Sequence, residues 1–230
     1  MSFDATKIKE TLDITMSNHA LFHEAVTHRS YLNEHKSHPV PHNERLEFLG
    51  DAVLELVVTE RLFADFPDRP EGELTSLRAA LVNSDMLSKV GSALGIDEFL
   101  LMSRGEAKDT GRARHFLIAN AVEAVIGALY LDQGYDAAKS FIEDRVLTRT
   151  QEVLDSKLYT DPKSRFQEIS QEKLSITPQY RVLRESGPDH DRTFVAGVYV
   201  GDELVAEGEG LSKQEAQRNA AKNGLVKKGW

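Results

Sequence analysis

Residues 43–54 place three acidic side chains on one face of an otherwise apolar helix, and this pattern limits where the helix can lie. Glu44, Glu47 and Asp51 are spaced i, i+3 and i+7, which is the spacing of a single helical face. Most other side chains in residues 46–58 are apolar, so the helix is expected beside a core. Like charges on adjacent turns repel, and apolar surroundings raise that cost. We expect a positive partner to compensate the acids, and a hard divalent cation is the simplest candidate.

The composition is that of a globular protein without disulfide bonds. The 230 residues suffice for one large domain or two modest ones, with 40% apolar and 28% charged residues. The absence of cysteine excludes disulfides and thiolate metal sites and fits a cytoplasmic protein. Residues 1–10 lack the apolar core of a signal peptide. No run reaches the roughly 18 apolar residues of a membrane span, so no membrane partner is expected.

The first part of the chain follows a helical pattern. Apolar residues recur at helical spacing in four segments: 20–26, 46–66, 74–94 and 118–131. Prolines and glycines separate these segments. The pattern predicts an all-α domain over residues 1–155, with a linker at residues 150–160.

The pattern changes near residue 160. Asp161 followed by Pro162 predicts the start of a helix. The spacing of Ser212 and Glu215 predicts the capping box of a final helix. Three segments of alternating apolar residues between them predict strands: 180–183, 193–200 and 204–206. The sequence therefore predicts a second, α+β domain of order α-β-β-β-α over residues 160–230.

The net charge of −9 taken alone argues against a nucleic-acid-binding protein. The charge is unevenly distributed, because residues 160–230 hold 11 basic and 11 acidic residues. The negative excess therefore lies in the first domain, and basic residues gather in the predicted final helix.

A second helix offers further oxygen ligands. Asn120 and Glu123 are three residues apart and so share one helical face. Glu71 lies in a turn between the two helices. Such a set suits Mg²⁺-assisted phosphodiester hydrolysis, in which the ion activates water and neutralises charge. Ordinary surface charge is the alternative, because spacing alone does not show that the two helices converge.

Residues 43–54, which read NERLEFLGDAVL, resemble the signature of bacterial ribonuclease III, a family that cleaves double-stranded RNA. Other resembling segments follow in order: THRSY at 27–31, EGEL at 71–74, LRA at 77–79 and ANAVEAVIGA at 119–128. The predicted α-β-β-β-α unit resembles a double-stranded RNA-binding domain. The resemblance covers nearly the whole chain and implies an all-α endonuclease domain followed by an RNA-binding domain.

The resemblance also implies a role for each acid. Glu47, Asp51 and Glu123 match acids that hold catalytic Mg²⁺ ions, for which Mn²⁺ substitutes, and the last two match the acids described as catalytic. Glu44 and Glu71 match supporting acids near the scissile phosphate. The family forms homodimers that leave 5′-phosphate and 3′-hydroxyl ends with short 3′ overhangs. The resemblance thus implies a cytoplasmic, homodimeric enzyme of rRNA and mRNA processing.

Asn120 departs from the family pattern, in which aspartate is a common metal ligand at this position. An amide oxygen can coordinate a hard cation but brings no charge. Asn120 could be a natural variant that remains active, an engineered inactivating change, or the mark of a protein that binds without cutting. We favour the first explanation because Glu47, Asp51 and Glu123 all remain. The alternative function is a cleavage-impaired, dimeric double-stranded RNA-binding protein.

The resemblance places the RNA contacts in the second domain. Double-stranded RNA is recognised through phosphates and 2′-hydroxyls across the minor groove. Lys213 begins the final helix, where the helix dipole also attracts phosphate. That helix carries fewer lysines than the family pattern, which predicts weaker binding and a shallower salt dependence. The candidate RNA-binding residues are Gln167, Glu168, His190, Lys213, Gln214 and Gln217.

Overall fold

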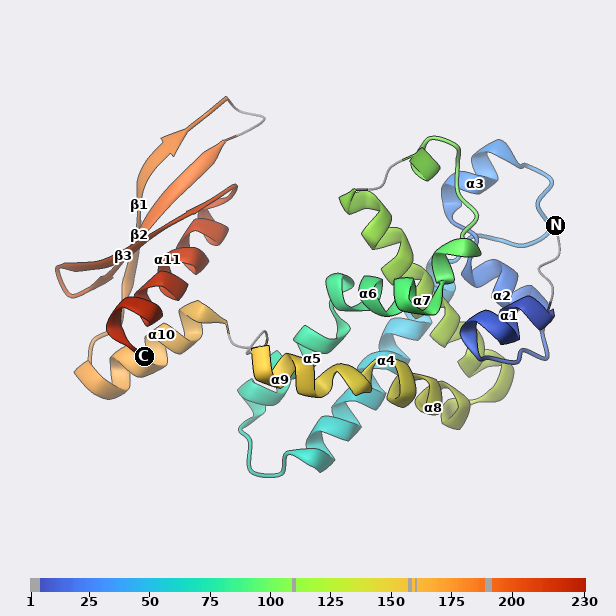
Figure 1. Ribbon diagram of the computed structural model, residues 1–230, viewed down its shortest axis with the longest axis horizontal. Coiled ribbons are helices and arrows are strands. Elements are labelled where there is room, and N and C mark those ends of the chain that lie inside the picture. The colour runs from blue at the N-terminus through green and yellow to red at the C-terminus, as the bar shows by residue number, and fades with distance from the viewer. Residues whose placement is uncertain (1–4, 109–110, 157–158, 160, 189–191) are drawn as a thin grey trace. The chain divides into compact units, whose positions relative to one another are not determined.

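The computed structural model describes residues 5–108, 111–156, 159, 161–188 and 192–230. The chain divides into two compact units (Figure 1). Residues 1–159 form the helical unit, and residues 160–230 form the α–β unit. A helical unit followed by a unit with a three-stranded antiparallel sheet confirms the fold class predicted from the sequence.

The helical unit consists of α-helices joined by turns and short 3₁₀ segments. Its α-helices are α1 (Ala5–Leu12), α2 (His19–Ala25), α3 (Arg29–Glu34), α4 (Glu44–Asp65), α5 (Glu71–Val82), α6 (Ser84–Leu94), α7 (Arg112–Gln133), α8 (Tyr135–Arg145) and α9 (Thr150–Ser156). The 3₁₀ segments are η1 (Ile96–Glu98), η2 (Glu106–Lys108) and η3 (Leu147–Arg149). The two longest helices, α4 and α7, pack against each other and carry the acids singled out in the sequence.

Helix α7 is the central helix of the hydrophobic core. Its Ala121, Val122, Val125 and Ile126 are at most 1% exposed. Among the helices of the described residues, only α7 is long and apolar enough to span a membrane, through Ala113–Gln133. It packs against α2, α4, α6 and α8, which explains the apolar composition, since a helix buried on most sides needs no polar face.

Two glycines allow α4 and α7 to cross at very short range. A Cβ atom on Gly50 would lie 1.8 Å from the carbonyl oxygen of Glu123. A Cβ atom on Gly127 would lie 2.3 Å from the carbonyl oxygen of Leu46. Both distances are far below van der Waals contact, so no larger residue fits without moving a helix. The crossing therefore holds the acidic face of α4 beside the face of α7 that bears Glu123.

Two features of the helical unit differ from the sequence-based expectation. The segment 74–94 is divided at Asn83, whose side chain accepts a hydrogen bond from Met86 N (2.9 Å) and caps α6. The predicted linker is wrong for residues 150–156, because these form α9 and bury Val153 completely.

The α–β unit has the predicted element order. Its elements are α10 (Pro162–Leu174), β1 (Gln179–Ser186), β2 (Thr193–Val200), β3 (Glu203–Gly210) and α11 (Lys213–Lys228), with the antiparallel strands in the order β1-β2-β3. Asp161 caps α10 by accepting a hydrogen bond from Ser164 N (3.1 Å), and Ser212 caps α11 by accepting one from Glu215 N (3.1 Å). Both predicted caps are thus confirmed. One buried core joins the helices to the sheet and contains Phe166, Val198, Val205, Ala220 and Ala221.

Candidate active site

Acidic side chains from α4 and α7 meet where the two helices cross. The Asn120 side chain forms a hydrogen bond with the Glu47 carboxylate. The negative charges of Glu47 and Asp51 both act on Glu123. The structure therefore brings together two residues of α4 and two residues of α7. These four residues, Glu47, Asp51, Asn120 and Glu123, are called the acidic cluster below.

The acidic cluster concentrates negative charge in a partly buried place. Burial, followed by the charges of Asp51 and Glu47, raises the pKa of Glu123 to about 8. Burial and the charges of Glu44 and Asp51 also raise the pKa of Glu47, against the hydrogen bond from Asn120. Within the described residues, no lysine or arginine forms an ion pair with any acid of the cluster. In the described part of the chain, this negative charge is therefore not paired with a basic side chain.

The oxygen donors of the acidic cluster fit a hard cation in kind. Three carboxylates and one amide oxygen are ligands that Mg²⁺ prefers. In the described part of the chain, no group of three or more acidic or histidine side chains is arranged to hold an ion by itself. Mg²⁺ commonly takes only one or two protein carboxylates and completes its shell with water and substrate phosphate. The cluster therefore fits a sparse, water-rich site rather than a closed cage.

The two supporting acids differ in their relation to the acidic cluster. Glu44 lies next to the acidic cluster, and its negative charge contributes to raising the pKa of Glu47. Its carboxylate is 3.4 Å from Arg29 Nη1 and 3.7 Å from His42 Nδ1. Glu71 begins α5 and accepts a hydrogen bond from Thr75 Oγ1 (2.8 Å). Among the described residues, no contact joins Glu71 to the cluster.

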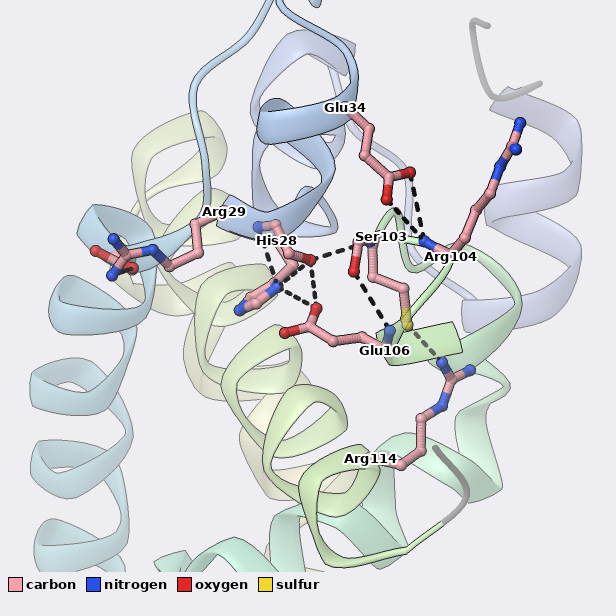
Figure 2. A network of polar contacts seen from close by, with 10 residues as sticks. His28, Arg29, Glu34, Ser103, Arg104, Glu106 and Arg114 are labelled. Carbon is pink, nitrogen blue, oxygen red and sulfur yellow. Dashed lines mark hydrogen bonds and ion pairs between the residues drawn. The ribbon is translucent and has the colours of Figure 1, made fainter. Parts of the chain in front are cut away.

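A polar network fixes the start of α3 beside the segment that leads to α7 (Figure 2). His28 caps α3 by accepting a hydrogen bond from Ser30 N (3.3 Å). His28 Nδ1 also lies 2.9 Å from Glu106 Oε2, and Ser30 Oγ donates to the same carboxylate. Arg29 points away from this network, toward Glu44 of α4 (Figure 2). The network therefore orients the arginine that contacts the acid beside the cluster.

Helix α4 has an exposed apolar face, of which the sequence singled out only Leu56, as a core or dimer contact. Phe48, Leu56 and Phe63 are 81%, 52% and 74% exposed, and they are called the α4 apolar stripe below. A signal for this exposure was present in the sequence. At 100° per residue, Phe48 lies beside Glu44 and Asp51 on the helix, and not on the face that carries the core residues. Large apolar side chains that remain this exposed commonly mark an interface.

The candidate RNA-binding residues that the structure describes lie on the two helices of the α–β unit. Gln167 and Glu168 are exposed on α10, and Lys213 and Gln214 are exposed at the start of α11. Gln217 accepts a hydrogen bond from Lys163 Nζ (2.9 Å), so α10 and α11 adjoin at this point. His190 lies outside the described residues.

Comparisons with protein families agree with both units. A model described as ribonuclease-III-like matches residues 18–150. A model of the double-stranded RNA binding motif matches residues 162–227. Together the two matches cover nearly the whole chain in the predicted order.

Individual proteins and solved structures that resemble this chain are also ribonucleases III. Ribonuclease 3 of Enterococcus faecalis is 43% identical over 96% of this chain and 95% of its own. Ribonuclease 3 of Natranaerobius thermophilus is 44% identical over 95% and 94%. The nuclease domain of Campylobacter jejuni ribonuclease III matches with a TM-score of 0.56 and 37% identity, covering 64% of this chain and 96% of that one. The chain therefore belongs to the ribonuclease III family of endoribonucleases that act on double-stranded RNA.

Proposed function

We propose that the protein hydrolyses phosphodiester bonds of double-stranded RNA in a Mg²⁺-dependent reaction at the acidic cluster. The observation that carries this proposal is the convergence of Glu47, Asp51 and Glu123 from two helices, without a basic partner in the described residues. The burial and mutual repulsion that raise the pKa of Glu123 to about 8 are what a bound cation relieves. In this proposal Mn²⁺ can replace Mg²⁺.

The side chains of the cluster have distinct tasks in this reaction. When bound, Mg²⁺ supplies a Lewis acid and a water of lowered pKa at the scissile phosphate. Asp51 and Glu123 are the catalytic acids, and their carboxylates bind the cation with Glu47. The amide of Asn120 holds the Glu47 carboxylate in place, since the two side chains are hydrogen-bonded. Glu44 is a supporting acid whose charge is partly balanced by Arg29.

We further propose that the enzyme acts as a homodimer. The α4 apolar stripe leaves three large apolar side chains exposed on one helix, and a second copy would bury them. A solved structure of the Campylobacter jejuni nuclease domain, with a TM-score of 0.55 and 38% identity, is described as flexible in the region involved in dimer formation. Two copies supply two acidic clusters, one for each strand of the RNA. Paired cuts would leave 5′-phosphate and 3′-hydroxyl ends with short 3′ overhangs.

The α–β unit holds the duplex for this reaction. Shape-based binding through phosphates and 2′-hydroxyls needs polar and basic side chains on one surface. Gln167 and Glu168 of α10 and Lys213 of α11 supply them, together with Gln214 and Gln217. Structured rRNA and mRNA precursors contain duplexes of this kind, and we propose them as cytoplasmic substrates. The alternative of a cleavage-impaired binding protein receives no support from the comparisons.

Cleavage assays with end-labelled RNA test this function. The protein is incubated with a duplex and with either of its single strands, in Mg²⁺ and in EDTA. We expect products only from the duplex in Mg²⁺, carrying 5′-phosphate and 3′-hydroxyl ends. Glu98→Gln is the control for substitutions in the acidic cluster and should cut the duplex like the wild type. It also removes one carboxylate, but Glu98 pairs with Lys7 (3.3 Å) on the surface of the helical unit. Duplex cleavage in EDTA, or an intact duplex in Mg²⁺, would overturn the proposal.

A further inference from the structure

Lys213, the first residue of α11, is already paired with an acid of the sheet. Its Nζ lies 3.1 Å from Glu185 Oε1 of β1. The same Nζ lies over the ring of Phe194, 5.6 Å from the ring centroid. Glu185 stands opposite Phe194 in the register of β1 and β2, so the pairing of these strands fixes both partners of the lysine.

The Glu185 carboxylate also contacts a second cation. Arg192 Nη1, at the start of the β2 side of the hairpin, is 3.8 Å from Glu185 Oε2. One carboxylate therefore serves two basic side chains of the α–β unit. Lys213 and Glu185 are 58% and 39% exposed, so the pair lies at a surface that a ligand can reach.

Lys213 lies at the N-terminus of α11, where the helix itself attracts anions. A lysine in the first turn of a helix joins the helix dipole and the unpaired backbone N–H groups in attracting phosphate. A phosphate approaching Lys213 must displace the Glu185 carboxylate or come to rest beside it. Like charges at such short range repel, so either course weakens the phosphate contact.

We propose that Glu185 is an internal competitor of the RNA phosphate, a carboxylate that occupies Lys213 and Arg192 in the free protein and limits affinity for double-stranded RNA. The proposal rests on the proposed RNA-binding role of the α–β unit and adds a residue that opposes it. It also gives a reason for part of the modest positive charge of this unit, since one acid neutralises two of its cations. Limited affinity favours release of the RNA after cleavage.

The chain contains a matched control for this pair. Glu203 Oε1 of β3 binds Lys228 Nζ at 3.0 Å, in the last turn of the same helix. Fifteen residues separate the two lysines, which is about 22 Å along the helix axis. At physiological salt this distance exceeds the screening length of about 8 Å. Glu203→Gln thus removes the same charge from the same kind of pair at the opposite end of α11.

Binding of the full-length protein to a fluorescent RNA duplex tests the proposal, in EDTA so that the RNA stays intact. We expect Glu185→Gln to bind about two- to fivefold more tightly than the wild type, because an exposed ion pair is worth about that much. The dissociation constant should also depend more steeply on salt. Glu203→Gln should bind like the wild type, and Glu185→Asp, which keeps the charge, should bind more weakly than Glu185→Gln.

A double-mutant cycle with Lys213→Gln separates competition from a merely structural effect. If Glu185 acts through Lys213, most of the gain from Glu185→Gln disappears in the Lys213→Gln background. Equal or weaker binding by Glu185→Gln, or the same gain with and without Lys213, would overturn the inference. If none of these proteins binds the duplex, the proposed RNA-binding function fails instead, so the two failures are distinguishable. Thermal denaturation of each variant confirms that it is folded.

Discussion

Glu123 is the acid of the cluster whose protonation depends most on its neighbours. Its side chain extends from α7 toward two acids of α4, and burial removes part of the water that would otherwise screen them. A carboxyl with a pKa of about 8 is half protonated at about pH 8 and mostly protonated at neutral pH. The proposed binding of a cation would therefore be linked to proton loss at Glu123.

This linkage makes the stability of the free protein depend on pH. The pKa of Glu123 rises from 4.5, its ordinary value, to about 8 in the folded state. The folded state thus holds the proton more tightly, and this stabilisation, complete below about pH 4.5, is lost as the pH rises through 8. Because solvent reaches part of the side chain, the loss is about 1–2 kcal/mol.

We therefore expect Glu123→Gln to lose less stability than the wild type between pH 5 and pH 8. Glutamine resembles the protonated acid and cannot ionise. The free energies of unfolding of both proteins, measured in EDTA at the two pH values, should differ most at pH 8. Parallel pH dependence in the two proteins would show that Glu123 is not repelled by Asp51 and Glu47.

Asn120→Asp tests the departure from the family pattern. An added carboxylate beside Glu47 should lower the Mg²⁺ concentration for half-maximal cleavage, on the order of tenfold for about 1.4 kcal/mol. The rate at saturating Mg²⁺ should stay within about twofold if, as the proposal implies, the amide oxygen of Asn120 also binds the ion. Cleavage rates over a Mg²⁺ titration measure both quantities. A large gain at saturating Mg²⁺ would mean that Asn120 impairs the protein.

The sequence predicted the acids that meet where α4 and α7 cross, but not the neighbours of every predicted site residue. The acids of α4 and α7 could be found because helical spacing and a long motif mark them. The contact of Lys213 with Glu185 could not be predicted, because it depends on the register of β1 against β2 and on where α11 lies over the sheet. Local spacing carries no information about such a meeting of distant segments.

At the scale of helices, the site depends on how closely α4 and α7 approach. Spacing along each helix predicts which residues share a face, but not that the two faces meet. The meeting depends on Gly50 and Gly127, where backbone of one helix touches backbone of the other. A larger residue at either position would push the acidic cluster apart.

Gly127→Ala should therefore destabilise the helical unit and reduce cleavage together. Overpacking at a rigid backbone contact costs about 3 kcal/mol, or about 6–12 °C in melting temperature for a unit of this size. Gly72→Ala is the control, because a Cβ at Gly72 meets nothing within 4 Å. Calorimetry of both variants tests this, and an unchanged melting temperature for Gly127→Ala would contradict the close crossing.

Two strands of the α–β unit are longer than the sequence predicts: β1, which extends from Gln179 to Ser186 and not only over 180–183, and β3. Residues 204–206 were predicted as a strand, whereas β3 extends from Glu203 to Gly210. The missing half contains alternating glycine and glutamate, which are poor strand formers by propensity. Gly208 is needed there because a Cβ would lie 2.0 Å from Ala220 N of α11. Tertiary packing against the helix, and not local preference, sets the length of this strand.

At the scale of the whole molecule, the α4 apolar stripe is the feature that an isolated chain does not explain. Phe48 belongs to the same helix face as the acids, so a partner that covers it also lies beside the acidic cluster. Dimerisation and catalysis are therefore expected to share α4.

Phe48→Asp should weaken the homodimer without unfolding the chain. Placing a charge in an apolar interface costs several kcal/mol in association but little in the monomer, where Phe48 is 81% exposed. Val226→Asp is the matched control, since Val226 is 78% exposed in the α–β unit. Sedimentation velocity at micromolar concentration should show dimers for the wild type and the control, and monomers for Phe48→Asp. A dimer that persists unchanged would place the interface elsewhere.

The most direct measurement compares RNA binding and RNA cleavage in the same samples for the wild type, Asp51→Asn and Glu123→Gln. Both substitutions remove a charge from the acidic cluster and leave the α–β unit unchanged. We expect the two variants to bind a duplex as tightly as the wild type in Mg²⁺ and to cut it at least about a hundredfold more slowly. Cleavage at the wild-type rate by either variant would show that the acids of α4 and α7 do not form the catalytic site.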